Sequence, residues 1–464
     1  MTTPSRQPQA SPVCAKSTLA RKPCGQRAVL TACVLTALLA CSPAVQAQSL
    51  IELYQSARAF DASYQSSRLQ FDANVFRAEQ ARAGLLPSAG LGGGISRSNF
   101  DNTNPSVERS FSTQNATLSA SQPLYRPGNV ANYRQGQRQV DQSRAQLDAA
   151  EQDLIVRTSQ AYFDVLAAQD TLAFVQAQKA AVAEQLAFAK RNFEVGTSTI
   201  TDSREAQARF DLVTAQELAA ENDLLVRKIA LDQLVGIAST QPRGLAMPLA
   251  LPAVLPSDVN SWVVQSELLH PSIRQARSGV DIAELEVIKA EAGHKPTVDA
   301  VASYQLSRNP SGTVQSVLAS RASTSSIGVS LNLPLFAGFA TQNRIRETLL
   351  LRDKASSDLA IARRTVAQNT RTTYFGVQSG QGQVRALEAA ELSSQSALDA
   401  NRLGYQVGVR INIDVLTAQS QLFQTKRDLA QARYNVLLGN LRLRQANGSL
   451  SADDLLPINA LLVK

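Results

Sequence analysis

Apolar residues recur at every seventh position along one long segment of the chain, 137–195, which contains neither glycine nor proline. The recurring positions are Leu147, Leu154, Ala161, Ala168, Val175, Val182 and Ala189. Companion positions four residues further on are held by Val165, Leu172, Leu186 and Phe193. This heptad pattern predicts a helix that packs along a seam. At about 1.5 Å per residue the helix is roughly 90 Å long, which is more than a compact domain needs.

Four more helices follow from the same kind of pattern. They are expected at 50–83, 202–235, 341–405 and 412–446. Gly196 and Gly408 mark the turns that join the two longest helices to their successors. Gly376, Gly380 and Gly382 interrupt the pattern of the second long helix, so we expect a soft spot there. Taken alone, these helices could also form a soluble coiled coil.

Four shorter segments instead alternate apolar and small or polar residues, which predicts β-strands. The apolar sets are Ala89, Leu91, Gly93 and Ile95; Ala116, Leu118 and Ala120; Val298, Ala300, Ala302, Tyr304 and Leu306; and Ile327, Val329, Leu331 and Leu333. Each strand could extend to about ten residues, the length that a tilted transmembrane strand needs. Long polar loops are expected at 97–109 and 307–324.

One apolar face and one polar face are typical of a membrane barrel, although a half-buried sheet in a soluble domain shows the same alternation. A membrane barrel needs about eight strands to close. Four strands in one chain therefore predict that several copies share one barrel.

The order of predicted helices and strands occurs twice along the chain, which indicates an internal duplication. Tyr162 corresponds to Tyr374, and Gly196 corresponds to Gly408, each pair being 212 positions apart. We expect a first repeat at 48–241 and a second at 259–450, with a tail at 451–464. Pro242, Pro248, Pro252 and Pro256 define a proline-rich linker at 242–258.

The first 47 residues have the features of a signal peptide. Five basic residues and no acidic residue precede or border the apolar run 28–40, and Val45-Gln46-Ala47 offers a cleavage site. The apolar run is too short to span a bilayer, which argues against the alternative of a membrane anchor. Leu38-Leu39-Ala40-Cys41 offers a second route, cleavage before a lipidated Cys41, but Leu39 fits that motif poorly.

Removal of the leader changes the chemistry available to the chain. All four cysteines lie in it, at Cys14, Cys24, Cys33 and Cys41, and the formal charge falls from +8 to +3 without it. Thiol chemistry is then excluded, and the basic excess indicates targeting and not nucleic-acid binding.

Few residues in the remaining sequence could support enzymatic chemistry. His270 and His294 lack metal-ligand spacing, and no GxxxxGK[ST] or HExxH motif occurs. The glycines of 90–94 lie inside a strand pattern and do not indicate a phosphate-binding loop. We therefore expect no enzyme activity, no cofactor and no metal.

With these features the chain resembles the TolC family of outer-membrane channel-tunnels. The resemblance is carried by the duplicated layout, by 81–87, by Pro334-Leu335-Phe336, and most specifically by the segments 405–418 and 431–435. It implies an α+β membrane protein: a homotrimeric 12-stranded β-barrel, four strands per protomer, continuous with a long α-helical periplasmic tunnel. It also implies outer-membrane lipid, a periplasmic membrane-fusion adaptor, and an inner-membrane ABC or proton-driven transporter as partners.

The same resemblance implies a gate at the periplasmic tip. Its positions match Thr201 and Asp202 on one hairpin and Tyr405 and Arg410 on the other. An arginine–carboxylate pair with a tyrosine hydroxyl is directional yet breakable. Asp202 could instead be an ordinary helix cap.

Two further positions match the family's tip. Gln185 matches another gate contact, but Arg402 occupies the partner position where the family has an acid. Asp414, itself another possible helix cap, matches one of two acidic rings that favour cations, while Thr417 replaces the second. We expect an export duct of a type I secretion or efflux system. The alternatives are a lipid-anchored drug-efflux component and a periplasmic coiled-coil adaptor or scaffold.

Overall fold

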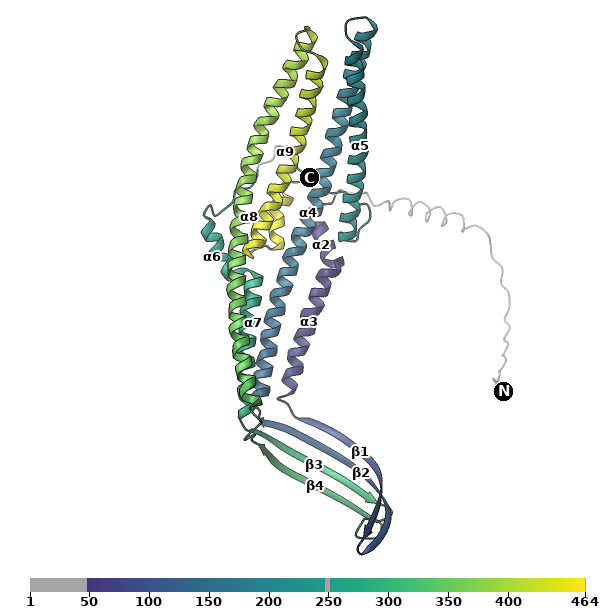
Figure 1. Ribbon diagram of the computed structural model, residues 1–464, viewed down its shortest axis with the longest axis vertical. Helices are drawn as coiled ribbons and strands as arrows, with labels where there is room; N and C mark the ends of the chain where they lie inside the picture. The colour runs from purple at the N-terminus through teal and green to yellow at the C-terminus, as the bar shows by residue number, and fades with distance from the viewer. Residues whose placement is uncertain (1–47, 247–250, 464) are drawn as a thin grey trace, which may run out of the picture. The chain divides into compact units, whose positions relative to one another are not determined.

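The computed structural model describes residues 48–246 and 251–463, so the leader lies outside the described residues. The helical elements are α2 (Leu50–Phe60), α3 (Ala62–Ala83), α4 (Pro127–Glu194), α5 (Ile200–Val235), α6 (Val259–Leu269), α7 (Pro271–Glu291), η1 (Ala292–His294), α8 (Ala340–Gln406), α9 (Asn412–Asn447), η2 (Ala452–Asp454) and α10 (Leu455–Asn459). The strands are β1 (Ser88–Thr103), β2 (Ser106–Tyr125), β3 (Thr297–Asn309) and β4 (Ser320–Asn332) (Figure 1).

The order of elements confirms the duplication. Two helices, two strands and two long helices follow one another from α2 to α5, and the same order returns from α6 to α9. The long helix α4 contacts α3 and α7 in one part of its length and α5 and α9 in another, and α8 packs on α7 and α9. The helices therefore form a layer in which α3 and α5 lie on one side of α4, and α8 lies beyond α7 and α9 on the other side, with α6 packed on it (Figure 1).

One helix prediction needs correction. The helix expected at 50–83 is broken at Asp61, whose extended backbone ends α2 and whose carboxylate accepts the Tyr64 N–H to cap α3. The soft spot expected at Gly376, Gly380 and Gly382 stays a prediction, and α8 is continuous through these positions. Among the described residues, no helix is both long and apolar enough to cross a bilayer.

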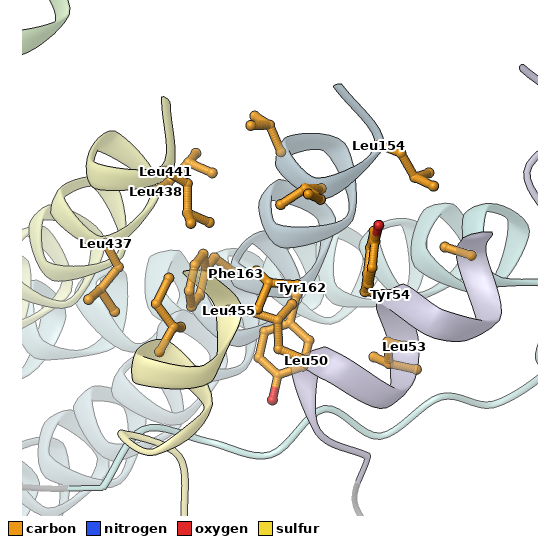
Figure 2. Packing of buried hydrophobic residues seen from close by; sticks show 14 of the residues in the cluster. Leu50, Leu53, Tyr54, Leu154, Tyr162, Phe163, Leu437, Leu438, Leu441 and Leu455 are labelled. Carbon is orange, nitrogen blue, oxygen red and sulfur yellow. The ribbon is translucent and has the colours of Figure 1, made fainter. Parts of the chain in front are cut away.

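The main core lies where α2 and α10 pack against the long helices α4, α5 and α9. Figure 2 shows Leu50 and Leu53 of α2, Tyr162 and Phe163 of α4, and Leu437 of α9 packed together, and Leu455 of α10 closes the cluster. Tyr162 and Phe163 meet edge to face at 5.8 Å between ring centroids. Packing around these rings holds both repeats in one unit.

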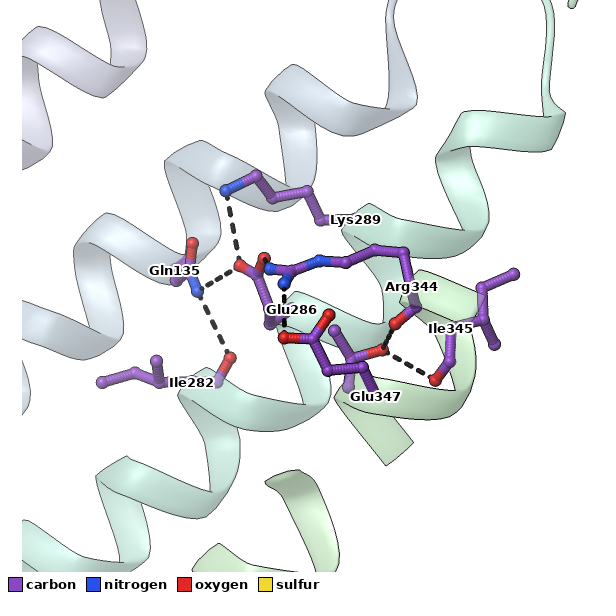
Figure 3. Close-up of polar contacts among 8 residues, drawn as sticks. Gln135, Ile282, Glu286, Lys289, Arg344, Ile345 and Glu347 are labelled. Carbon is purple, nitrogen blue, oxygen red and sulfur yellow. Dashed lines mark hydrogen bonds and ion pairs between the residues drawn. The ribbon is translucent and has the colours of Figure 1, made fainter. Parts of the chain in front are cut away.

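A polar network binds α7 to both of its long neighbours. Glu286 of α7 accepts hydrogen bonds from Gln135 of α4 at 3.0 Å and from Arg344 of α8 at 2.7 Å, as Figure 3 shows. Burial alone would raise the pKa of Glu286, but the hydrogen bonds from Gln135 and Arg344, with the nearby Lys289, hold it below its ordinary value.

The four strands form one antiparallel sheet in the order β1-β2-β3-β4. The long loop expected at 97–109 is wrong, because pairing continues to Thr103 and Ser106 at the end of the hairpin. The loop expected at 307–324 shortens to 310–319. Backbone pairing needs no alternation of side chains, so these polar strand ends could not be recognised from the pattern.

One face of the sheet consists of unburied apolar side chains. Leu91, Ile95 and Ile327 are 80%, 80% and 91% exposed. The apolar side chains that alternate along these strands are therefore left largely uncovered by the rest of the described structure. An apolar surface of this kind needs lipid or another protein against it.

Candidate functional site

The two long hairpins end in tight turns that place the gate positions. The first hairpin consists of α4 and α5, and the second consists of α8 and α9. Gly196 and Gly408 turn the chain with φ values of +79° and +80°. No atom lies near a side chain built at either glycine, so the backbone conformation, and not crowding, requires glycine there.

Asp202 acts as a helix cap within its own hairpin. Its carboxylate accepts the Thr199 backbone N–H at 3.1 Å, and the Thr199 hydroxyl accepts the Asp202 N–H at 3.3 Å. This reciprocal capping box begins α5. The neighbouring Thr201 is exposed. The capping alternative therefore describes the role of Asp202 inside one copy.

Tyr405 reaches from the second hairpin to the first. Its ring meets Phe188 of α4 edge to face, with centroids 5.8 Å apart. Burial raises the pKa of Tyr405, the Asn192 side chain opposes that rise, and the charge of Asp202 adds to it. The Tyr405 hydroxyl is buried with no hydrogen-bond partner among the described residues, so its pairing with Asp202 stays a prediction.

Arg410 does not reach the first hairpin within one copy. Its guanidinium lies 3.7 Å from the carboxylate of Asp414, one turn further along. Both side chains are more than a third exposed, so this pair contributes little to stability. The Arg410 side chain folds over Gly404, where an added Cβ would lie 2.7 Å from the Arg410 Cγ. The pairing of Arg410 with Thr201 and Asp202 stays a prediction.

Gln185 finds a partner that sequence reasoning missed. Its amide donates to the Oδ1 atom of Asn412, and the Asn412 Nδ2 atom donates to the Asp202 carbonyl at 3.3 Å. Asn412 is fully buried. The available signal was the repeat itself, since position 412 is polar where its counterpart in the first repeat, Ile200, is apolar.

A second polar contact joins the hairpins further from the tip. The Ser420 hydroxyl of α9 accepts hydrogen bonds from Gln178 of α4, at 3.5 Å, and from Arg209 of α5. These residues line a groove of about 370 Å³ between the hairpins. Its walls also include Phe174, Leu212, Phe423 and Arg427.

A third contact is more deeply buried. The Tyr434 hydroxyl of α9 donates to Asp170 of α4 at 2.6 Å. Burial raises the pKa of Asp170, while the hydrogen bond from Tyr434 partly opposes that rise. Burial also raises the pKa of Tyr434, so its phenol stays neutral.

Ligating side chains are not gathered at these contacts. Across 48–246 and 251–463, no group of three or more His, Cys, Asp or Glu side chains is arranged to hold a metal ion. His270 begins α7, where its Nδ1 atom accepts the Ser272 N–H at 3.1 Å, and burial lowers its pKa. What the two hairpins share is a row of hydrogen bonds that join α9 to α4 and α5.

Comparison with known proteins agrees with this geometry. The profile of the "Outer membrane efflux protein" family matches residues 53–237 and 262–449. Outer membrane protein TolC of Vibrio cholerae serotype O1 is 33% identical, over 92% of this chain and 97% of its own length. Alkaline protease secretion protein AprF of Pseudomonas aeruginosa is 30% identical, over 88% and 86% respectively. A crystal structure of CusC has the same fold, with a TM-score of 0.75 and 17% identity over 87% of this chain and 93% of that one.

Proposed function

Because the chain belongs to the outer membrane efflux protein family, we propose that three copies close into one tube that opens and shuts at its periplasmic tip. The protein is an outer-membrane channel component of efflux or type I secretion, with a periplasmic tunnel, and it is not an enzyme. The row of hydrogen bonds between the two hairpins is the observation that supports the gate.

Unpaired edges support assembly into a closed ring. In the described sheet, β1 and β4 each pair with one neighbour only. The edge helices carry exposed apolar side chains, which are Leu69 and Phe76 on α3, Leu212, Leu218, Leu225 and Ile229 on α5, and Leu350, Ile361, Leu392 and Leu403 on α8. A second copy would bury the α8 edge against α3 and α5 and join β4 to β1. Three copies give twelve strands, enough to close a barrel around an aqueous lumen.

The gate residues act between copies in this proposal. Arg410 stands on the outer turn of the second hairpin, exposed and weakly paired with Asp414. Across the junction to the next copy it would meet Thr201 and the carboxylate of Asp202. Tyr405 supplies the contact within the copy through its ring, which packs edge to face on Phe188.

An adaptor would dock in the groove between the hairpins. Arg209 lines the groove and donates to the neutral Ser420 hydroxyl. A polar or acidic helix of a periplasmic membrane-fusion adaptor would offer Arg209 a better acceptor. Exchanging that bond would separate the hairpins, which links docking of the adaptor and its inner-membrane transporter to opening.

The lipid-anchored alternative fits the geometry poorly. Tyr162, whose hydroxyl lies 3.5 Å from the Gln48 carbonyl, stands 35 residues along α4 from Pro127, or about 50 Å from the strands. Cys41 lies outside the described residues, and the seven residues from it to Gln48 span at most about 25 Å. This shortfall favours cleavage after Ala47. The scaffold alternative is wrong, since the chain is a member of a channel family.

The experiment is conductance of the detergent-extracted protein in planar lipid bilayers. The double variant Arg410→Ser with Tyr405→Phe removes one contact between copies and one polar group at the tip, so single-channel conductance should rise. Arg191→Ser is the matched control, since its guanidinium bonds to the Ala187 carbonyl of its own helix. Parent-like conductance of the double variant, with pore formation intact, would refute the gate.

A further inference from the structure

We propose that Asn412 ties the second hairpin to both helices of the first within each copy, and so holds the closed tip independently of contacts between copies. The inference rests on the proposed gate and names a residue that the resemblance did not supply. It starts from Asn412, a fully buried polar side chain in the first turn of α9.

Both polar ends of the Asn412 amide are occupied, and by different helices. Its Oδ1 atom accepts from Gln185 of α4, and its Nδ2 atom donates to the Asp202 carbonyl of α5 at 3.3 Å. The Asp202 carboxylate remains engaged in its capping box. One side chain from α9 therefore hydrogen-bonds to both helices of the first hairpin.

Apolar packing continues the same contact away from the tip. Leu416, one turn beyond Asn412, is buried against Val182 and Leu186 of α4 and Ala206 of α5. Asn412, Leu416 and Ser420 lie four residues apart on one face of α9, so they meet the first hairpin together. Asn412 is the polar end of this face. A hydrogen bond between neutral groups there gives direction at modest strength, which suits a tie that must open.

The two repeats differ at this position, which supports a specific role. Ile200, the counterpart of Asn412 in the first repeat, is 48% exposed and apolar. A structural need common to both hairpins would require the same kind of residue at both positions. At this pair of positions, only the second hairpin buries a polar side chain, and it does so against the first.

The test is Asn412→Leu, which keeps the volume and removes both hydrogen bonds. Losing two such bonds should raise the fraction of time spent in a high-conductance state about tenfold. Gln185→Leu should have a smaller effect, and combining it with Asn412→Leu should add nothing. Ile200→Leu is the matched control at the equivalent position and should conduct like the parent.

A cross-linking measurement shows whether the tie lies within one copy. No cysteine occurs after Cys41, so Gln185→Cys with Asn412→Cys supplies the only thiols in the described residues. A short bis-maleimide should join the two positions inside one chain, leave the denatured mass at one protomer, and keep conductance low even with Arg410→Ser and Tyr405→Phe. Cross-links that join separate chains would overturn the proposal.

The outcomes separate the tie from the gate. If Asn412→Leu conducts like the parent while Arg410→Ser with Tyr405→Phe conducts more, the tie is wrong and the gate stands. If neither variant changes conductance, the gate itself fails. A heat-stable parent-like oligomer of Asn412→Leu confirms that the variant folds.

Discussion

Replacing glycine by alanine in α8 should destabilise the helix contact at Gly380 but stabilise the helix at Gly376 and Gly382, because the surroundings of these glycines differ. A Cβ built on Gly380 would lie 3.1 Å from the Val436 Cγ2 atom of α9. The arrangement is reciprocal, since a Cβ on Gly439 of α9 would lie 3.1 Å from the Val377 Cγ2 atom of α8. At Gly376 and Gly382 no atom lies within 4 Å of the added carbon.

The expected magnitudes follow from two opposing effects. Alanine in a helix interior is favoured over glycine by about 1 kcal/mol. That gain remains at Gly376 and Gly382. At Gly380 and Gly439 the new methyl groups press on valines that are 2% and 3% exposed, and overpacking of such a core costs about 1–3 kcal/mol. The pair Gly380→Ala and Gly439→Ala should therefore loosen the contact between α8 and α9.

Amide hydrogen exchange measures this locally. Exchange across 374–384 should slow about thirtyfold in Gly376→Ala with Gly382→Ala, the equivalent of about 2 kcal/mol. It should become faster than in the parent when Gly380 and Gly439 are both replaced. Equal slowing in both pairs would refute the account of reciprocal valine packing.

Two further predictions concern charge. Burial raises the pKa of Asp170, so the stability that its neutral form contributes is complete below the unfolded pKa and is lost as the pH rises through the raised folded pKa. The Tm of Asp170→Asn relative to that of the parent should therefore increase between about pH 4 and about pH 7. A constant difference in Tm would contradict this. Asp414→Ala should weaken block of the channel by multivalent cations, because three copies would otherwise concentrate carboxylates at the constriction. Undiminished block would place the cation site elsewhere.

The long-range features of the fold could be predicted from the sequence because they repeat. The heptads of 137–195 and the 212-residue offset each involve many residues, so local exceptions do not erase them. Single-residue features were less accessible. Asp61 breaks a helix through its own cap, and the packing of Val436 beside Gly380 joins residues of two different helices.

At the site, the sequence supplied the positions but not their partners. Gln185 matched a gate contact, yet its partner Asn412 lies 227 residues away, in a different hairpin. Side-chain pairing across hairpins depends on how α9 rests on α4 and α5, which no local pattern encodes. The only signal in the sequence was that Ile200 and Asn412, at corresponding positions of the two repeats, differ in polarity. The burial of Asn412 in the structure shows why this difference matters.

The central claim is that the open edges of one chain are closed by further copies. Native mass spectrometry of the protein extracted from outer membranes tests it most directly. The account requires a particle of three chains, with α8 of each copy covering α3 and α5 of the next. A single chain that remains monomeric in mild detergent, with its strand edges unpaired, would contradict it.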